Sequence, residues 1–239
     1  MDLIILKNKE EAVKKAAKLI SKEMNKKPFL VLGLASGKTM IPLYNELVNL
    51  YRKRKINFSK AKTFNLDEYQ NVEEKYSLRS FMDKHLFSKI NLKKENICFL
   101  PTKADKKACK NYETKIKSAR GIDLQILGIG RNAHIAFNEP ESSFKSQTRI
   151  VKLASSTRKA NSNFFPSIKY VPTKAATMGL STILKSKKII LLATGKNKAK
   201  AISVALKQKP NKKSPAGILQ RHKQTIFILD KEAAANTKI

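Results

Sequence analysis

The sequence predicts one α/β domain built on an open, mostly parallel sheet in three layers, with helices on both faces of the sheet. Short apolar runs alternate along the chain with longer segments whose apolar residues recur at helical spacing. The apolar runs are continuous, as expected for strands that are buried on both faces of a parallel sheet. No internal repeat, long linker or low-complexity segment interrupts the alternation, so we treat residues 1–239 as a single domain.

The individual elements follow from these patterns in chain order. The expected strands share a short, mostly apolar run and lie at residues 3–6, 29–34, 62–66, 96–100, 123–127, 148–153, 188–193 and 225–229. The expected helices lie at residues 9–24, 40–51, 78–89, 106–118, 174–185, 198–206 and 214–220. The first strand is expected at an edge of the sheet. Residues 155–170 have no clean period, and we expect them to form a mobile flap.

Composition indicates a globular protein of a reducing compartment. Hydrophobic residues make up 41% of the chain, too many for a disordered protein. The apolar run at residues 3–6 is too short for the core of a signal peptide or for a membrane span. The two cysteines, Cys98 and Cys109, form neither a disulfide framework nor a metal-ligand spacing. We therefore expect a cytoplasmic protein without a membrane partner or a bound metal.

The formal net charge of +32 raises the alternative of a polyanion partner. No Asp or Glu occurs between Glu141 and Asp230, so this part of the chain is expected to attract anions, whether a substrate phosphate or a nucleic acid. The lysines are scattered along nearly every expected helix, and no RNA-recognition motif or zinc-finger spacing accompanies them. This distribution favours solvated surfaces over a nucleic-acid interface.

One loop concentrates groups that can transfer protons. It follows the expected strand at residues 123–127, and Gly128 and Gly130 let the chain turn sharply and approach a ligand. In open α/β sheets, ligands bind just beyond the carboxyl ends of the strands, where this loop emerges. The loop brings Asn132, His134 and Glu139, and a neutral His whose tautomer is fixed by a carboxylate can both take and give a proton. The alternative is a glycine turn with an incidental His.

Asp67 and Glu68 follow the expected strand at residues 62–66 and offer two carboxylates at the same edge of the sheet. The alternative is that Asp67 caps the helix that follows and Glu68 is solvated.

Ser36, Gly37, Lys38 and Thr39 lie between a strand and a helix, where free backbone N–H groups and the helix dipole favour an anion. Hydroxyls and the Lys38 cation would strengthen such a site, although the spacing is not that of a Walker A loop. A plain capped turn would look much the same.

Five segments carry a family signature. They are residues 64–69 (FNLDEY), 128–140 (GIGRNAHIAFNEP), 157–162 (TRKANS), 193–199 (ATGKNKA) and 215–222 (PAGILQRH). They resemble the glucosamine-6-phosphate deaminases nearly end to end, and the run HIAFNEP is highly specific. The related 6-phosphogluconolactonases share the fold but have different residues in the corresponding segments. The resemblance implies a modified Rossmann-like fold that needs no metal or organic cofactor.

The resemblance also implies a reaction, the isomerising deamination of D-glucosamine 6-phosphate to fructose 6-phosphate and ammonia. It implies that His134, oriented by Glu139 and assisted by Asn132, moves the proton that opens the sugar ring. Asp67 would carry a proton from C2 to C1. The resulting imine is hydrolysed, and we expect the terms hydrolase and isomerase both to describe the enzyme. The implied phosphate-binding residues are Ser36, Gly37, Lys38, Thr39 and Lys198.

Several positions depart from the family pattern. Lys38 stands where many members have Gly or Ser, and Ala133 replaces a Gly, so the backbone there must tolerate a Cβ atom. Asn163 stands where a phosphate-binding Arg is expected, and Lys38 can compensate only as a point charge. Longer members that form allosteric hexamers carry a C-terminal extension beyond the last strand. We therefore expect a monomer or small homo-oligomer without strong allostery.

Three alternatives stay open on the sequence. The first is the same chemistry on galactosamine 6-phosphate. The second is a catalytically weakened homologue that binds sugar phosphates or polyanions, consistent with the high charge and with Asn163. The third is lactone hydrolysis, which the run Phe137-Asn138-Glu139 disfavours.

Overall fold

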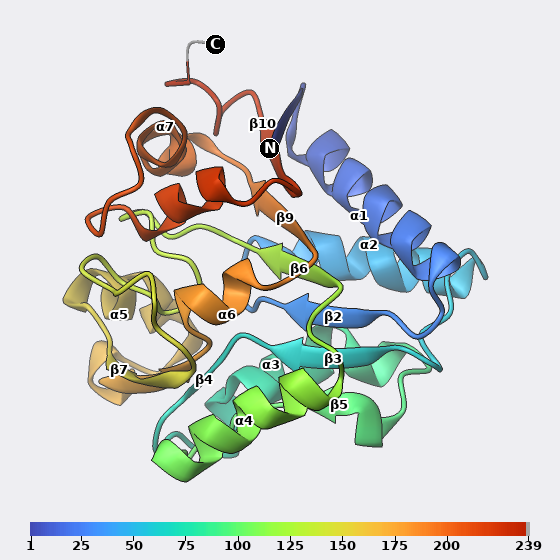
Figure 1. The fold of residues 1–239 in the computed structure, drawn as a ribbon, viewed down its shortest axis with the longest axis horizontal. Coiled ribbons are helices and arrows are strands. Elements are labelled where there is room, and N and C mark those ends of the chain that lie inside the picture. Colours follow the sequence, from blue (N-terminus) through green and yellow to red (C-terminus); the bar gives the residue numbers. More distant parts are fainter. Residues whose placement is uncertain (238–239) are drawn as a thin grey trace.

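A seven-stranded parallel sheet forms the centre of the molecule (Figure 1). In this computed structural model, which describes residues 1–237, the strand order is β1-β10-β9-β6-β2-β3-β5 and every neighbouring pair is parallel. The strands are β1 (Asp2–Leu6), β2 (Val31–Leu34), β3 (Lys62–Asn65), β5 (Ile97–Cys98), β6 (Leu124–Leu127), β9 (Lys188–Ala193) and β10 (Thr225–Asp230). The predicted α/β class is confirmed, and β1 lies at the predicted edge.

Helices lie in front of and behind this sheet in Figure 1. They are α1 (Lys9–Lys26), α2 (Met40–Arg52), α3 (Leu78–His85), α4 (Lys106–Ser118), α5 (Ser155–Asn161), α6 (Leu180–Leu184) and α7 (Ala199–Lys207). Pro215–Arg221 forms a 3₁₀ helix. Helix α1 shows the expected pattern, because the side chain of Asn8 caps its start and its buried stripe includes Ala12, Ala16 and Ile20. Among the helices of residues 1–237, none has the length and apolar character needed to cross a bilayer.

A second sheet, which the sequence did not predict, lies beside the first (Figure 1). It is antiparallel, with the order β4 (Asp67–Tyr69), β8 (Lys174–Thr177) and β7 (Arg149–Lys152). The expected helix at residues 174–185 is therefore wrong. Ala175 and Ala176 are fully buried in the middle strand of this sheet, so pairing on both sides overrides the helical preference of alanine. The backbone of Ser146 packs directly on Gly179, and only Leu180–Leu184 is helical.

The segment predicted as a flap packs on the small sheet. It contains α5 and two 3₁₀ turns, Ser162–Phe164 and Ile168–Tyr170. Phe165 is buried in a hydrophobic cluster with Tyr69 and Phe137, separate from the main core. Its mobility stays a prediction.

The topology gathers four loops at one edge of the large sheet. Strands β9, β6, β2 and β3 are neighbours in that order, and because they are parallel their carboxyl ends meet at the same edge. The chain runs from β2 to β3 on one side, whereas β6 lies on the other side of β2. The boundary between β2 and β6 is a topological switch point, where open α/β sheets bind ligands.

Candidate active site

A cavity of 1190 Å³ opens at this edge of the sheet. It is lined by eight of the nine site residues expected from the sequence, namely Ser36, Gly37, Lys38, Thr39, Asp67, Asn132, His134 and Lys198. The ninth, Glu139, lies behind His134 and contacts it. The structure therefore brings together groups that are up to 162 positions apart along the chain (Ser36 to Lys198) in one cavity.

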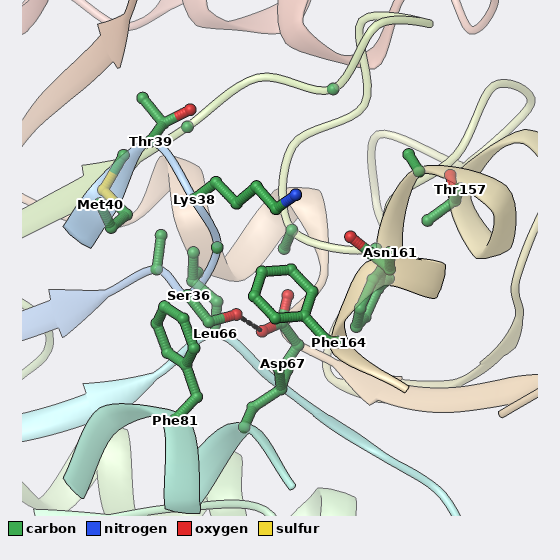
Figure 2. A pocket seen from close by; sticks show the side chains of 18 of the residues that line it. Ser36, Lys38, Thr39, Met40, Leu66, Asp67, Phe81, Thr157, Asn161 and Phe164 are labelled. Carbon is green, nitrogen blue, oxygen red and sulfur yellow. Dashed lines mark hydrogen bonds between the residues drawn. The ribbon is translucent and has the colours of Figure 1, made fainter. Parts of the chain in front are cut away.

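Asp67 faces this cavity from the start of β4, just after β3 ends (Figure 2). Its side chain is almost fully buried, and Ser36 Oγ donates to its Oδ1 atom across 3.4 Å. Burial is the main cause that raises the pKa of Asp67 to about 7, and the negative charge of Glu68 adds to it, against a smaller opposite effect of Ser36. A carboxylate with this pKa is suited to take and return a proton near neutral pH.

The alternative interpretation, in which Asp67 caps the next helix and Glu68 is solvated, is wrong. Glu68 is not solvated: its side chain is buried and accepts backbone N–H groups of Tyr69, Leu78 and Arg79. It therefore caps the start of α3, and Asp67 is left free to face the cavity. The adjacent carboxylates thus have different tasks, one structural and one directed at a ligand.

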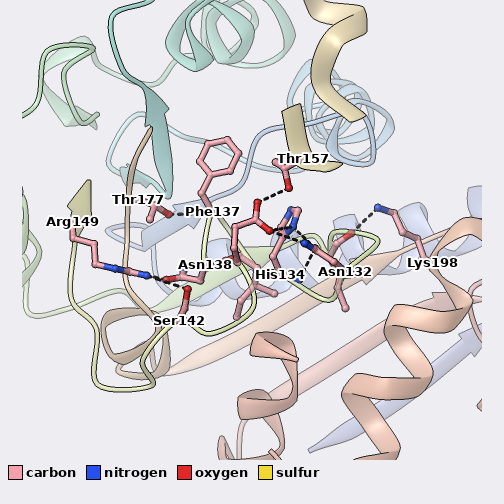
Figure 3. Close-up of polar contacts among 12 residues, drawn as sticks. Asn132, His134, Phe137, Asn138, Ser142, Arg149, Thr157, Thr177 and Lys198 are labelled. Carbon is pink, nitrogen blue, oxygen red and sulfur yellow. Dashed lines mark hydrogen bonds and ion pairs between the residues drawn. The ribbon is translucent and has the colours of Figure 1, made fainter. Parts of the chain in front are cut away.

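His134 belongs to a chain of polar contacts (Figure 3). Its Nδ1 atom lies 2.6 Å from Asn132 Oδ1 and 3.4 Å from Glu139 Oε2, and Asn132 Nδ2 donates to the same Oε2 across 2.7 Å. Both neighbours of Nδ1 are acceptors, so Nδ1 carries the proton of the neutral ring and Nε2 keeps its lone pair. Burial acts to raise the pKa of Glu139, but contacts with His134, Thr157 and Asn132 outweigh it and hold the pKa at about 2.

The backbone of the loop after β6 is shaped around the imidazole. A Cβ atom on Gly130 would lie 2.1 Å from His134 Cε1, so only glycine leaves room for the ring. Ala133 has a φ of 63°, in the left-handed region that favours glycine. Ala133 therefore carries its Cβ atom in a backbone conformation that costs an alanine more than a glycine.

Two cationic side chains, Lys38 and Lys198, also line the cavity. The side chain of Thr39 makes no capping bond to α2 within the described chain, so the plain capped turn is not what forms there. Lys38 Nζ lies 5.3 Å from the centre of the Phe164 ring (Figure 2). Lys198 Nζ donates to the carbonyl of Ile129 across 2.6 Å, and burial lowers the pKa of Lys198. Two cations and a free helix start suit an anionic ligand group.

Some lining residues carried no role in the sequence analysis. Thr157 and Phe164 come from the flap, and Phe81 comes from α3. Phe81 meets Phe164 edge to face, with ring centres 6.0 Å apart. The motif TRKANS contained Thr157, but no spacing in the sequence indicates that its hydroxyl reaches Glu139. Within residues 1–237, no group of three or more His, Cys, Asp or Glu side chains is arranged to hold a metal ion.

Known proteins resemble this chain over nearly its whole length. A family profile described as Glucosamine-6-phosphate isomerases/6-phosphogluconolactonase matches residues 7–228. A protein of Clostridium botulinum (strain Langeland) named glucosamine-6-phosphate deaminase is 50% identical over 243 residues, covering 100% of both chains. One of Mycoplasma mycoides subsp. mycoides SC with the same name is 48% identical and covers 98% of this chain and 97% of its own. A solved monomeric glucosamine-6-phosphate deaminase superposes with a TM-score of 0.96 at 39% identity, covering 99% of this chain and 100% of its own.

These comparisons correct one expectation. The term hydrolase is wrong, because the matching family is described by isomerases and the similar proteins are named deaminases. The term isomerase and the relation to amino-sugar metabolism agree with them.

Proposed function

The chain belongs to the glucosamine-6-phosphate isomerase/6-phosphogluconolactonase family, and on that premise we propose that it converts D-glucosamine 6-phosphate and water to fructose 6-phosphate and ammonia. The observation that carries the proposal is that Asp67 and His134 line one cavity, each with a local environment suited to proton transfer. The Lys38 and Lys198 cations that line the same cavity suit the phosphate.

Ring opening is the first step of the proposed reaction. The ring form of the sugar hides the C1 aldehyde, and opening needs a proton to leave the C1 hydroxyl and another to reach the ring oxygen. His134 is suited to this task because Nδ1 is fixed by Asn132 and Glu139, so Nε2 can accept a proton and then return it. The ionised Glu139 stabilises the imidazolium that forms in between.

Isomerisation follows in the open chain. The C1 carbonyl acidifies the proton on C2, and Asp67 takes it and delivers it to C1. The C1 oxygen gains a proton and the C2 amino group loses one, which leaves an imine at C2. Water then adds to the imine and ammonia departs, which gives the ketose. Because burial raises the pKa of Asp67 to about 7, the carboxylate is a stronger base than an exposed one and is still partly ionised near neutral pH.

Binding of the phosphate positions C1 and C2 of the substrate in the proposed reaction. Ser36, Gly37, Lys38 and Thr39, just before α2, and Lys198, at the start of α7, line the cavity and offer it hydroxyls, backbone N–H groups and two cations. Lys38 reaches the side of the cavity formed by residues 163–164, where the family pattern led us to expect an Arg. Binding energy at the phosphate holds C1 and C2 against the proton-transfer groups.

We propose further that the protein acts as a monomer in the cytoplasm and that residues 155–170 close over the substrate. The solved deaminase of similar structure is described as monomeric, which supports the first point. The cytoplasmic location is supported by the charged sugar phosphate substrate and by the two free thiols, Cys98 and Cys109. The closure of residues 155–170 over the substrate is supported by residues of α5 and by Phe164, which line the cavity.

A coupled assay for ammonia and fructose 6-phosphate tests the function. Wild-type protein should release both in equal amounts from glucosamine 6-phosphate, and kcat/KM for galactosamine 6-phosphate measures the preference at C4. Asp67→Asn should eliminate ammonia release while the circular dichroism spectrum stays native. Turnover retained in Asp67→Asn would exclude Asp67 as the base. Absence of ammonia from both sugars, with RNA retained at physiological salt, would favour a polyanion-binding protein.

A further inference from the structure

We propose that Thr157 is a positioning residue for ring opening, acting through Glu139 on the imidazole of His134. This inference rests on the proposed deaminase reaction. It goes beyond that reaction because it gives a flap side chain a part in proton transfer.

The two carboxylate oxygens of Glu139 have different partners. Oε2 receives Asn132 Nδ2 at 2.7 Å and lies 3.4 Å from His134 Nδ1. Oε1 accepts a hydrogen bond from Thr157 Oγ1. An ionised carboxylate has only acceptors, so the threonine hydroxyl is the donor in this bond.

The second anchor matters because of the shape of a glutamate side chain. Its terminal torsion has a broad energy profile, so a carboxylate held at one oxygen can still rotate. Thr157 fixes the other oxygen, and this keeps Oε2 on Asn132 Nδ2. Asn132 is thereby held with its Oδ1 atom 2.6 Å from Nδ1 of His134, and Oε2 itself stays 3.4 Å from Nδ1. The proton then stays on Nδ1 and the lone pair of Nε2 stays available to the sugar.

The hydroxyl of Thr157 is itself held by the fold. Thr157 is 3% exposed and lies in α5, the first helix of the flap. The next residue, Arg158, donates through its guanidinium to the carbonyls of Ile168 and Val171 at the other end of the flap. The placement of the flap therefore sets the position of the hydroxyl, and any displacement of α5 releases Oε1 of Glu139.

Thr157→Val removes the hydroxyl and keeps the shape of the side chain. We expect kcat/KM for glucosamine 6-phosphate to fall about tenfold, the effect of one hydrogen bond to a charged group. We also expect the isotope effect on kcat/KM with substrate deuterated at C2 to fall towards unity, because ring opening then limits the rate before Asp67 cleaves the C2–H bond. Thr157→Ser restores a hydroxyl and should recover both values.

Thr182→Val is the matched control. Thr182 Oγ1 donates to Glu113 Oε1 across 2.6 Å, so this substitution removes the same kind of partly buried bond between α6 and α4. Neither residue lines the cavity. It should lower the melting temperature and leave both the rate and the isotope effect as in the wild type. A tenfold loss of rate in Thr182→Val would assign the effect of Thr157→Val to general loss of packing.

The nitrogen-15 shifts of the His134 ring give a readout that does not depend on turnover. In the neutral ring one fixed tautomer gives two widely separated shifts, and we expect these in wild type, Thr157→Ser and Thr182→Val. In Thr157→Val the two shifts should converge as the tautomers mix. Unchanged shifts, rate and isotope effect in Thr157→Val would overturn the inference. A wild-type protein that releases no ammonia would instead overturn the proposed function, and the shifts would still test the role of Thr157.

Discussion

Two carboxylates of the site, Asp67 and Glu139, have opposite surroundings. Asp67 is buried beside Glu68, and its pKa rises to about 7. Glu139 is also partly buried, but contacts with His134, Thr157 and Asn132 hold its pKa at about 2. Two acids whose pKa values are driven apart can divide the work, one exchanging a proton and the other staying ionised. In the proposed reaction, Asp67 is the first and Glu139 the second.

The pH dependence of the rate follows from Asp67. A base works only when it is ionised, so kcat/KM should fall about tenfold for each pH unit below pH 7, where the pKa of Asp67 lies. Initial rates between pH 5 and pH 9 measure this acidic limb of the pH–rate profile. Glu68→Gln removes one cause of the raised pKa and should move the limb to lower pH. A limb that lies below pH 5 in the wild type would contradict this assignment.

Stability should depend on pH through the same residue. An unfolded Asp ionises near pH 3.8 and the folded Asp67 near pH 7, so between these values the folded state binds more protons and stability falls as pH rises. Asp67→Asn lacks this dependence. We therefore compare the free energy of unfolding of Asp67→Asn with that of the wild type, and expect the advantage of the variant to be larger at pH 8 than at pH 4 by a few kcal/mol. Urea unfolding at both values measures the difference. Asp83→Asn, at a half-exposed position, is the control and should show no such gain.

Among the secondary-structure elements, the sequence predicted those strands that consist of a continuous run of buried apolar residues. Strand β9 was predicted with its observed bounds, because five of its six residues are buried and apolar. Strand β8 was not predicted, because its alanines favour a helix. It is a strand because it pairs with β4 on one side and β7 on the other. Strand β4 has three residues, too few for a periodic signal. The contact of Thr157 with Glu139 could not be predicted either, because it depends on where α5 packs.

Helix α3 depends on a cap that comes from outside its own sequence. Glu68→Ala removes the acceptor of the buried N–H group of Leu78 and of the partly buried N–H group of Arg79, so the free energy of unfolding should fall by about 2–4 kcal/mol. Glu68→Gln keeps one oxygen acceptor and should cost less. Urea denaturation measures both changes. Glu73→Ala, at an exposed ion pair with Lys75, is the control and should change stability by less than about 0.5 kcal/mol. Equal losses in Glu68→Ala and Glu73→Ala would contradict the capping role.

The whole molecule carries its cations on the outside and places several of its acids inside. The chain has 50 Lys and Arg against 18 Asp and Glu, and the buried acids include Asp67, Glu68 and Asp230. Another, Asp123, is paired with Lys27 and Lys187. The surface is therefore dominated by positive charges that repel one another, and this repulsion opposes folding. The same field attracts an anionic substrate towards the cavity, where Lys38 and Lys198 lie.

Screening this repulsion should stabilise the protein. Raising NaCl from about 20 mM to about 200 mM shortens the range of charge interactions to near 7 Å, so we expect the melting temperature to rise by about 2–5 °C. Differential scanning calorimetry at fixed pH measures the shift. Exchanging three exposed lysines, Lys169, Lys209 and Lys213, for Gln should raise the melting temperature in low salt and weaken its response to NaCl. A melting temperature that falls with added NaCl would mean that attractive ion pairs outweigh the repulsion, and the surface charge would then stabilise the fold.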